Sequence, residues 1–181
     1  EGDKIHQFGE NEFRLYGLPA PNDDAVVGLL GENGLGKTVT SKILTGKLRP
    51  NLGDFENPKE WSEIKKKFRG TGLQNHIEKL ADDNVESATK PQQVERIPEA
   101  FDGTVEEFLT RNGRPENLSD VAEKFELAKL MGRDVGNLSG GELQRLAIAS
   151  TISEDAELYV FDEPSSFLDV KQRLKTGNEI R

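Results

Sequence analysis

The sequence predicts an α/β fold, because two short and almost continuously apolar runs alternate with segments of helical periodicity. The runs are AVVGLL (25–30) and LYVF (158–161), and such runs are typical of parallel strands buried on both faces. A glycine-rich turn, GENGLGKT (31–38), follows the first run and precedes a helical pattern. Strands that alternate with helices indicate a core built around a parallel sheet.

The remaining elements follow from periodicity and from helix stop signals. FRLYGL (13–18) is expected to form a strand, and residues 38–45 a helix that stops at Gly46. Apolar side chains recur at helical spacing on either side of a Gly-Thr-Gly turn, which predicts a hairpin of two short helices over 59–80. Further helices are expected over 104–110, 118–131 and 140–153, and the span 104–153 is interpreted as a separate helical lobe.

Composition limits the classes of protein to consider. The 181 residues are 34% hydrophobic and include 18 Gly, as expected for one globular domain. No cysteine is present, which excludes disulfides, thiolate metal sites and an iron–sulfur cluster carried by this chain. No apolar run is long enough to cross a membrane and the first residues are polar, so we expect a cytoplasmic protein without a membrane partner. The start at Glu1 and the helical pattern at the end lead us to expect a piece of a longer chain.

Charge is distributed unevenly along the chain. The total of 24 Lys and Arg against 33 Asp and Glu gives a net charge of −9, unlike a protein that coats nucleic acid. Residues 59–69 nevertheless carry five basic and two acidic side chains, a local charge of +3. Such a basic segment is either a solvated helix face or a contact point for an anion.

The segment GENGLGKT predicts a phosphate-binding loop, because it matches G-x-x-x-x-G-K-[ST] between a strand and a helix. Its glycines let consecutive backbone N–H groups face one anion, and the following helix N-terminus adds partial positive charge. Lys37 is expected to reach the β- and γ-phosphates of ATP, and the Thr38 hydroxyl to bind Mg²⁺. The alternative is an ordinary glycine-rich turn. The predicted ATP-binding residues of this segment are Gly31, Glu32, Asn33, Gly34, Leu35, Gly36, Lys37, Thr38 and Val39.

Two carboxylates follow the second apolar run. Asp162 is expected to hold Mg²⁺ through water, and Glu163 to act as the catalytic residue that polarises the attacking water. Alone, the pair would be two solvated acids at a strand end. With a phosphate loop in the same chain, the pair predicts an ATPase.

The string LSGGELQR (138–145) indicates the class of ATPase. Ser139, Gly140 and Gly141 open a helix and present N–H groups to an anion, although Ser-Gly-Gly alone is more often an ordinary N-cap. Since one nucleotide does not need two such loops from one chain, we expect this one to face the γ-phosphate bound by a partner domain. In order with the two other motifs, the string resembles the signature of ATP-binding-cassette proteins, which implies a P-loop cassette core with a helical signature lobe.

Nearly the whole chain resembles the first nucleotide-binding domain of the ribosome-recycling ATP-binding-cassette ATPases, the RNase L inhibitor family. The resemblance implies a single truncated cassette domain over 1–181, with 59–80 as a helix–loop–helix insertion and about 104–153 as the signature lobe. The strings that carry it are PNLGDFENP (50–58), FRGTGLQN (68–75), KPQQVERIP (90–98), LSGGELQR (138–145) and FDEPSSFLDVKQRLK (161–175).

The resemblance also implies roles for single residues. Gln92 matches the glutamine that contacts Mg²⁺ and water, and Glu142 and Asp169 match positions at the interface with a second cassette. Phe8 and Phe13 stand where the family has aromatic residues near adenine, with core packing an equally good interpretation of Phe13. The insertion implies contact with ribosomal RNA through Lys65, Lys66, Lys67 and Arg69.

The implied partners are a second cassette that this chain lacks, the small ribosomal subunit with its rRNA, and a termination factor. Closure of two cassettes on two ATP molecules would split the subunits, and hydrolysis would reset the protein. The alternatives are a membrane transporter's cassette and a non-hydrolysing ATP-binding module; the basic hairpin disfavours the first, and Glu163 the second. The family's switch histidine has no counterpart, since only His6 and His76 are present, so we expect almost no turnover from this chain alone.

Overall fold

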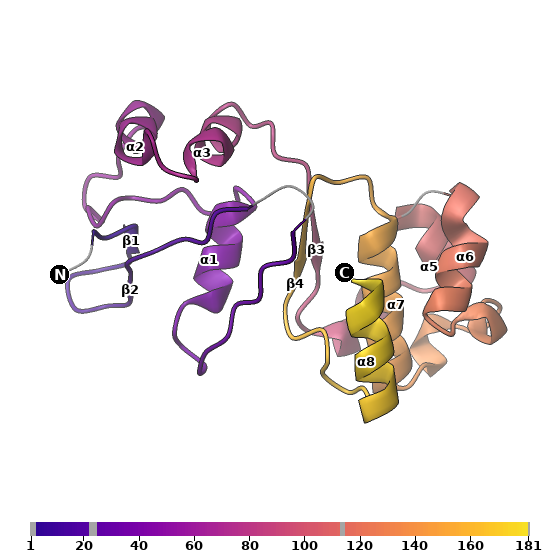
Figure 1. Ribbon diagram of the computed structural model, residues 1–181. Coiled ribbons are helices and arrows are strands. Elements are labelled where there is room, and N and C mark those ends of the chain that lie inside the picture. The colour runs from indigo at the N-terminus through magenta and orange to yellow at the C-terminus, as the bar shows by residue number, and fades with distance from the viewer. Residues whose placement is uncertain (1–2, 22–24, 113–114, 181) are drawn as a thin grey trace. The chain divides into compact units, whose positions relative to one another are not determined.

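The computed structural model describes residues 3–21, 25–112 and 115–180. They form two compact units, Glu1–Val85 and Glu86–Arg181, hereafter the first and second units (Figure 1). Each unit buries apolar side chains of its own. None of the helices in the described ranges is both long enough and apolar enough to span a membrane.

The first unit begins with a short antiparallel ladder. β1 (His6–Gln7) pairs with β2 (Arg14–Leu15), which is the observed part of the strand expected over 13–18. The buried Asn51 side chain accepts from the Gln7 N–H at 3.0 Å and donates to the Gln7 carbonyl at 2.7 Å. The side-chain amide of Asn51 thus makes the two hydrogen bonds that a neighbouring strand would make with Gln7. These bonds hold the loop around Asn51 beside β1.

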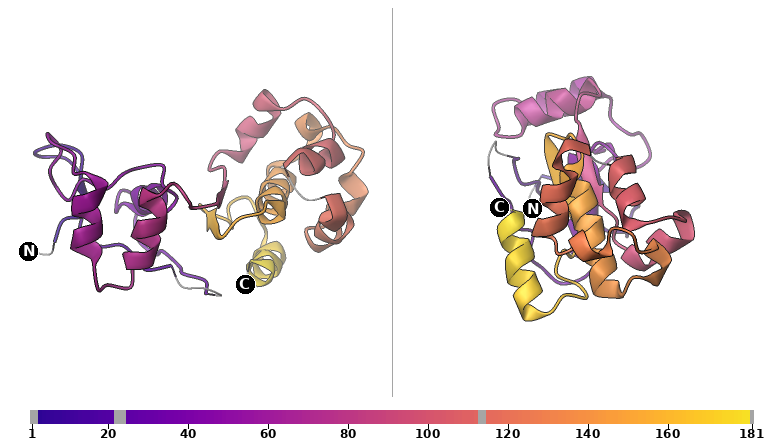
Figure 2. Two further views of the ribbon diagram at one scale, coloured as in Figure 1. Left: turned by 90° about the horizontal axis from the view of Figure 1, so that it is seen from above. Right: turned by 90° about the vertical axis from the view of Figure 1, so that its right-hand side faces the viewer.

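Three helices complete the first unit. α1 (Lys37–Leu44) confirms the helix expected after the glycine-rich turn, and Gly46 follows it with a φ of 75°. α2 (Trp61–Phe68) and α3 (Gln74–Ala81) form the expected hairpin and lie side by side (Figure 2). Their facing apolar side chains are buried, namely Ile64, Phe68, Ile77 and Leu80.

The hairpin is joined to α1 by a hydrogen bond. His76 on α3 donates through Nε2 to the carbonyl of Leu44, the last residue of α1, at 2.8 Å. A carbonyl oxygen only accepts, so Nε2 must carry the hydrogen. This bond satisfies one of the carbonyls that a helix C-terminus leaves without an intrahelical partner.

The second unit is built around one parallel strand pair and one central helix. β3 (Ser87–Lys90) pairs with β4 (Leu158–Phe161), which confirms the strand expected over 158–161. α7 (Gly140–Ser153) confirms the helix expected over 140–153. Around α7 lie α4 (Ile97–Ala100), α5 (Val105–Asn112), α6 (Leu118–Lys124) and α8 (Val170–Glu179).

The apolar core of the second unit follows from the sequence of α7. Its buried side chains include Leu146, Ile148 and Ala149, and they occupy almost the whole circumference of the helix. A helix that is apolar on all sides is stable only inside a core. Val105 and Leu109 of α5 belong to the same buried cluster.

Two expected elements differ from the structure. Residues 25–30 form no strand in the described part of the chain, and Leu30 is 98% exposed. An apolar run indicates that a segment can pair, but a strand exists only where a neighbour supplies hydrogen bonds. The helix expected over 118–131 ends at Lys124, because Glu126 has a φ of 56° that no α-helix accommodates; a short 3-10 turn, Ala128–Leu130, follows.

The hairpin core gives a first prediction. Ile64→Ala removes a fully buried side chain, so the first unit should lose about 2–5 kcal/mol of unfolding free energy. Trp61 is the sole tryptophan and begins α2, so its fluorescence during a urea titration follows the hairpin. Ser62→Ala, at an exposed position of α2, is the control and should unfold like wild type. Equal midpoints for all three proteins would show that the hairpin has no cooperative core.

Candidate functional site

The glycine-rich turn forms a loop closed on its own lysine. The Nζ of Lys37 donates to the carbonyls of Gly31 and Glu32, at 2.7 and 2.8 Å. Gly36 has a φ of 92° and immediately precedes the first turn of α1. The loop thus leads into a helix N-terminus whose first N–H groups have no intrahelical acceptor, which is an arrangement that binds phosphate.

An aromatic side chain lies against this loop. A Cβ on Gly36 would lie 2.3 Å from Cζ of Phe13, so only glycine permits this contact. The rings of Phe13 and Phe8 have centroids 6.4 Å apart, and Phe8 is 46% exposed. The structure therefore brings both predicted aromatic residues together beside the loop, with Phe8 open to a flat ligand.

A buried histidine, His6, packs against the ring of Phe8. The rings of His6 and Phe8 meet edge to face with centroids 4.7 Å apart. Burial lowers the pKa of His6, although a hydrogen bond with the Arg49 backbone favours its charged form. The neutral imidazole acts here as an apolar support for the exposed ring. The sequence analysis assigned His6 no such role.

In the second unit, the carboxyl end of β4 presents the two predicted acids. Asp162 is half-buried, whereas Glu163 is exposed and has a φ of 46°. The Ser166 hydroxyl donates to Oε2 of Glu163 at 3.2 Å. Gln92 is exposed shortly after the end of β3, and β3 runs parallel to β4. Because parallel strands end at the same edge, the predicted contacts for Mg²⁺ in this unit, Asp162 and Gln92, follow neighbouring strand ends.

A buried lysine lies next to these acids. Lys90, the last residue of β3, is 1% exposed and donates to the Pro91 carbonyl at 2.7 Å. It also donates to Oε1 of Gln144 at 3.4 Å, while Nε2 of Gln144 donates to the Glu163 carbonyl at 3.0 Å. Burial lowers the pKa of Lys90, and the nearby carboxylates of Asp162 and Glu163 oppose that shift.

Neither Lys90 nor Gln144 is among the residues predicted from the sequence. A signal was present, because alternation along β3 places Lys90 on the same face as buried Ala88. A lysine on the buried face of a strand requires a polar or charged partner. Gln144 lies within the signature string LSGGELQR, but the string alone does not indicate that this side chain is buried or which groups it contacts.

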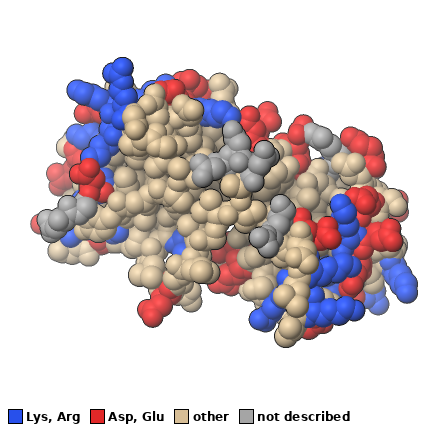
Figure 3. Space-filling model, in the orientation of Figure 1, with Lys and Arg blue, Asp and Glu red and all other residues tan. Residues whose placement is uncertain are grey.

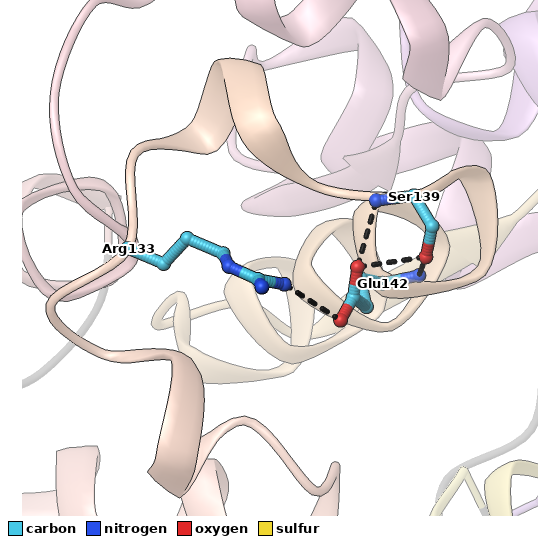
Figure 4. Close-up of polar contacts among 3 residues, drawn as sticks. All are labelled: Arg133, Ser139 and Glu142. Carbon is cyan, nitrogen blue, oxygen red and sulfur yellow. Dashed lines mark hydrogen bonds and ion pairs between the residues drawn. The ribbon is translucent and has the colours of Figure 1, made fainter.

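The signature serine caps α7 (Figure 4). Its hydroxyl and its backbone N–H both donate to Oε2 of Glu142 at 2.7 Å, and the Glu142 N–H donates back to the hydroxyl of Ser139 at 3.4 Å. Arg133 donates to Oε1 of Glu142 at 3.3 Å. These bonds to the Ser139 backbone and hydroxyl, together with Arg133, lower the pKa of Glu142. The ordinary N-cap weighed against a functional loop is thus present, as a capping box.

The signature glycines pack against the segment after β4. A Cβ on Gly141 would lie 3.0 Å from the Phe167 carbonyl oxygen, and one on Gly140 would lie 3.3 Å from the Phe167 ring. Nearby, Asp169 caps α8 by accepting from the Gln172 N–H at 2.8 Å. The residues predicted to meet a second cassette thus lie at the N-terminal ends of α7 and α8.

The basic residues of the hairpin gather over α2 (Figure 3). Two of these four cations are paired within the molecule. Lys65 forms an ion pair with Asp82 at 2.9 Å, and Lys67 forms one with Asp3. Within the described ranges, Lys66 and Arg69 are exposed and have no carboxylate partner.

Comparison with known proteins agrees with this arrangement. The sequence model of a family described as ABC transporter matches residues 21–166. The translation initiation factor rli1 of Schizosaccharomyces pombe is 46% identical over 184 aligned residues, which span 100% of this chain and 31% of that protein. The chain therefore spans about a third of the length of this relative.

Solved structures give the same result. A structure of an RNase-L inhibitor is 44% identical, with a TM-score of 0.89 over 99% of this chain and 35% of its own. A complex of the archaeal ribosomal stalk protein aP1 with the archaeal ribosome recycling factor aABCE1 is also 44% identical, with a TM-score of 0.88 over 98% and 34%. These matches confirm the predicted fold class and the resemblance to the RNase L inhibitor family.

The capping box predicts a pH-dependent contribution to stability. Because folding lowers the pKa of Glu142 below its ordinary 4.5, its ionised form stabilises the second unit above that pH, and the contribution disappears as pH falls through the lowered value. Wild type should therefore be more stable than Glu142→Gln at pH 7, and the difference should shrink in acid. Urea titrations followed by far-UV circular dichroism measure it, with exposed Glu123→Gln as control. A difference independent of pH would exclude the ionised cap.

Proposed function

The chain belongs to the ABC transporter family, and from this premise we propose that it binds and hydrolyses ATP as one cassette of a factor that separates ribosomal subunits. The observation that carries the proposal is the closed loop of residues 31–38, in which Lys37 is bound by the loop's own carbonyls. A loop already folded around its cation pays little ordering entropy when phosphate replaces those carbonyls.

The loop and its surroundings fit ATP with Mg²⁺. Lys37 supplies an ammonium for the phosphates, and the exposed Thr38 supplies a hydroxyl at the start of α1. Phe8 offers an exposed aromatic face for a base, since stacking accepts any base with a π-face. Hydroxyl and carboxylate oxygens are the ligands that Mg²⁺ prefers, which supports Thr38 and Asp162 as ligands, with Gln92 as a further contact. The bound ion would neutralise charge on the phosphate oxygens.

Hydrolysis is assigned to Glu163. Its carboxylate is exposed and held by the Ser166 hydroxyl, so it is oriented and open to a water molecule. The signature loop and Asp169 are proposed to meet a second cassette. The Ser139 hydroxyl already donates a hydrogen bond to Glu142. To donate to a phosphate, it would have to give up this existing hydrogen bond.

The ribosomal role rests on the relatives and on the hairpin. The relatives' names are those of a translation initiation factor and a ribosome recycling factor. Lys66 and Arg69 are exposed and unpaired within the described ranges, whereas exposed ion pairs such as Lys65 with Asp82 are weak enough to exchange for phosphate. We propose that α2 contacts rRNA with the unpaired cations first and that a termination factor joins the same complex.

ATP binding is tested by removing the loop's ammonium. Lys37→Ala should lower the affinity for a fluorescent ATP analogue in Mg²⁺ by at least about tenfold, because a charge-assisted bond is worth about 1.5–3 kcal/mol. Lys42→Ala, at an exposed position of the same helix, should bind like wild type. Equal affinities of all three proteins would overturn the site.

The hairpin prediction separates the paired from the unpaired cations. In the longer protein that carries this segment, Lys66→Glu with Arg69→Glu should weaken binding to small ribosomal subunits and lower the salt slope by about two, since about one counterion is released per phosphate contact. Co-sedimentation across a salt series measures both quantities. The matched control, Lys129→Glu with Lys171→Glu, reverses two exposed charges of the second unit. If the two double variants bind alike, α2 is only a solvated face.

A further inference from the structure

Lys90 and Gln144 form a polar relay inside the second unit that ends on the main chain of Glu163. Lys90 is 1% exposed and Gln144 is also 1% exposed, so neither side chain reaches solvent. The chain of donors runs from Nζ of Lys90 to Oε1 of Gln144 at 3.4 Å, and from Nε2 of Gln144 to the Glu163 carbonyl at 3.0 Å. Three separate elements are thereby connected: β3, α7 and the end of β4.

The lysine and the Glu163 carbonyl favour the same orientation of the Gln144 amide. An ammonium group only donates, so the side-chain oxygen of Gln144 must face Lys90. The amide nitrogen then necessarily faces the Glu163 carbonyl, which only accepts. The Glu163 carbonyl by itself also disfavours the flipped amide, which would place oxygen against oxygen, and Lys90 adds a second restraint on the same orientation.

Glu163 needs such a restraint. Its φ of 46° lies in the left-handed region, which is unfavourable for a non-glycine residue and persists only where neighbouring groups restrain it. The Glu163 carbonyl accepts from two donors, Gln144 Nε2 and the Ser166 N–H at 3.2 Å. The Ser166 hydroxyl in turn holds the Glu163 carboxylate at 3.2 Å, so main chain and side chain are positioned together.

We propose that Lys90 is a positioning residue that, through Gln144, holds Glu163 in the left-handed conformation that aims its carboxylate. The importance of this for catalysis rests on the proposed role of Glu163. Lys90 does not itself touch the reacting groups, because its ammonium is buried and bound to Pro91 and Gln144. Lys90 would affect hydrolysis only through the backbone conformation of the turn after β4.

The first test is hydrogen exchange on this chain. In Lys90→Met, which keeps an unbranched apolar stem, the segment 163–168 should exchange at least about tenfold faster at the Ser166 amide, because this N–H is bonded to a carbonyl that is no longer fixed. Exchange in α5 should stay unchanged. Lys90→Arg retains a donor to Gln144 and should restore most of the protection. Wild-type exchange over 163–168 in Lys90→Met would overturn the proposal.

Gln144→Glu tests the same relay if Lys90→Met fails to fold. Gln144→Glu has nearly the same shape and still accepts from Lys90, but it cannot donate to the Glu163 carbonyl. It should show the same faster exchange over 163–168 while the α7 amides stay protected. Protection equal to wild type in this variant would show that the relay does not hold the turn.

Turnover by the longer protein gives the catalytic readout. Lys90→Met and Gln144→Glu should each lower kcat by about ten- to a hundredfold while the KM for ATP changes less than about twofold, because an aimed carboxylate is disturbed and the phosphate loop is not. Glu163→Gln serves as reference. Full turnover in Glu163→Gln would refute the proposed function alone, since the exchange data would still decide whether Lys90 positions the turn.

Discussion

The burial of α7 on nearly all sides is the constraint on which the second unit depends. Leu146, Ile148 and Ala149 can be removed from water together only if other elements surround the helix completely. The N-terminus of α7 is thereby fixed, and with it the capped signature serine. Because Gln144 lies on the same helix, the packing that stabilises the core also sets the position of the turn after β4.

Polar groups in this structure are positioned by other polar groups rather than by shape alone. Asn51 takes the place of a strand partner, Glu142 completes the α7 cap, and Gln144 connects a buried ammonium to a main-chain carbonyl. Each of these side chains donates or accepts in a fixed direction, which is information that apolar packing cannot carry. Apolar packing determines where the helices and strands lie. These hydrogen bonds determine the conformation of the loop around Asn51, of the α7 N-terminus and of the turn after β4.

Much of the fold could be predicted because its signals are local. The start of α7 follows from Ser139 as an N-cap and its course from the apolar residues that recur after it, and the α2–α3 hairpin follows from spacing around Gly70. The phosphate loop could be predicted because its glycines and Lys37 are contiguous. Residues 25–30 could not be placed correctly, because pairing depends on a distant neighbour that composition does not reveal.

The roles of single side chains were predictable only where sequence neighbours determine them. Lys90 and Gln144 are 54 residues apart, and only the fold brings them together. The ion pairs of Lys65 and Lys67 likewise join α2 to acids outside that helix, so the pattern of the helix alone does not reveal them. The sequence left Phe13 open between a place near adenine and core packing, and its contact with Gly36 follows only from the fold.

The short strand pair has a consequence for how the protein behaves in concentrated solution. In the part of the chain that the structure describes, β3 and β4 pair only with each other, so each leaves one edge of backbone donors and acceptors open. Residues 25–30 add an exposed run with neither charge nor proline. Open edges and uncharged β-branched runs are the templates on which cross-β aggregates nucleate. The colloidal stability of this chain therefore depends on its net charge of −9, which keeps copies apart at low ionic strength and protects less as salt rises.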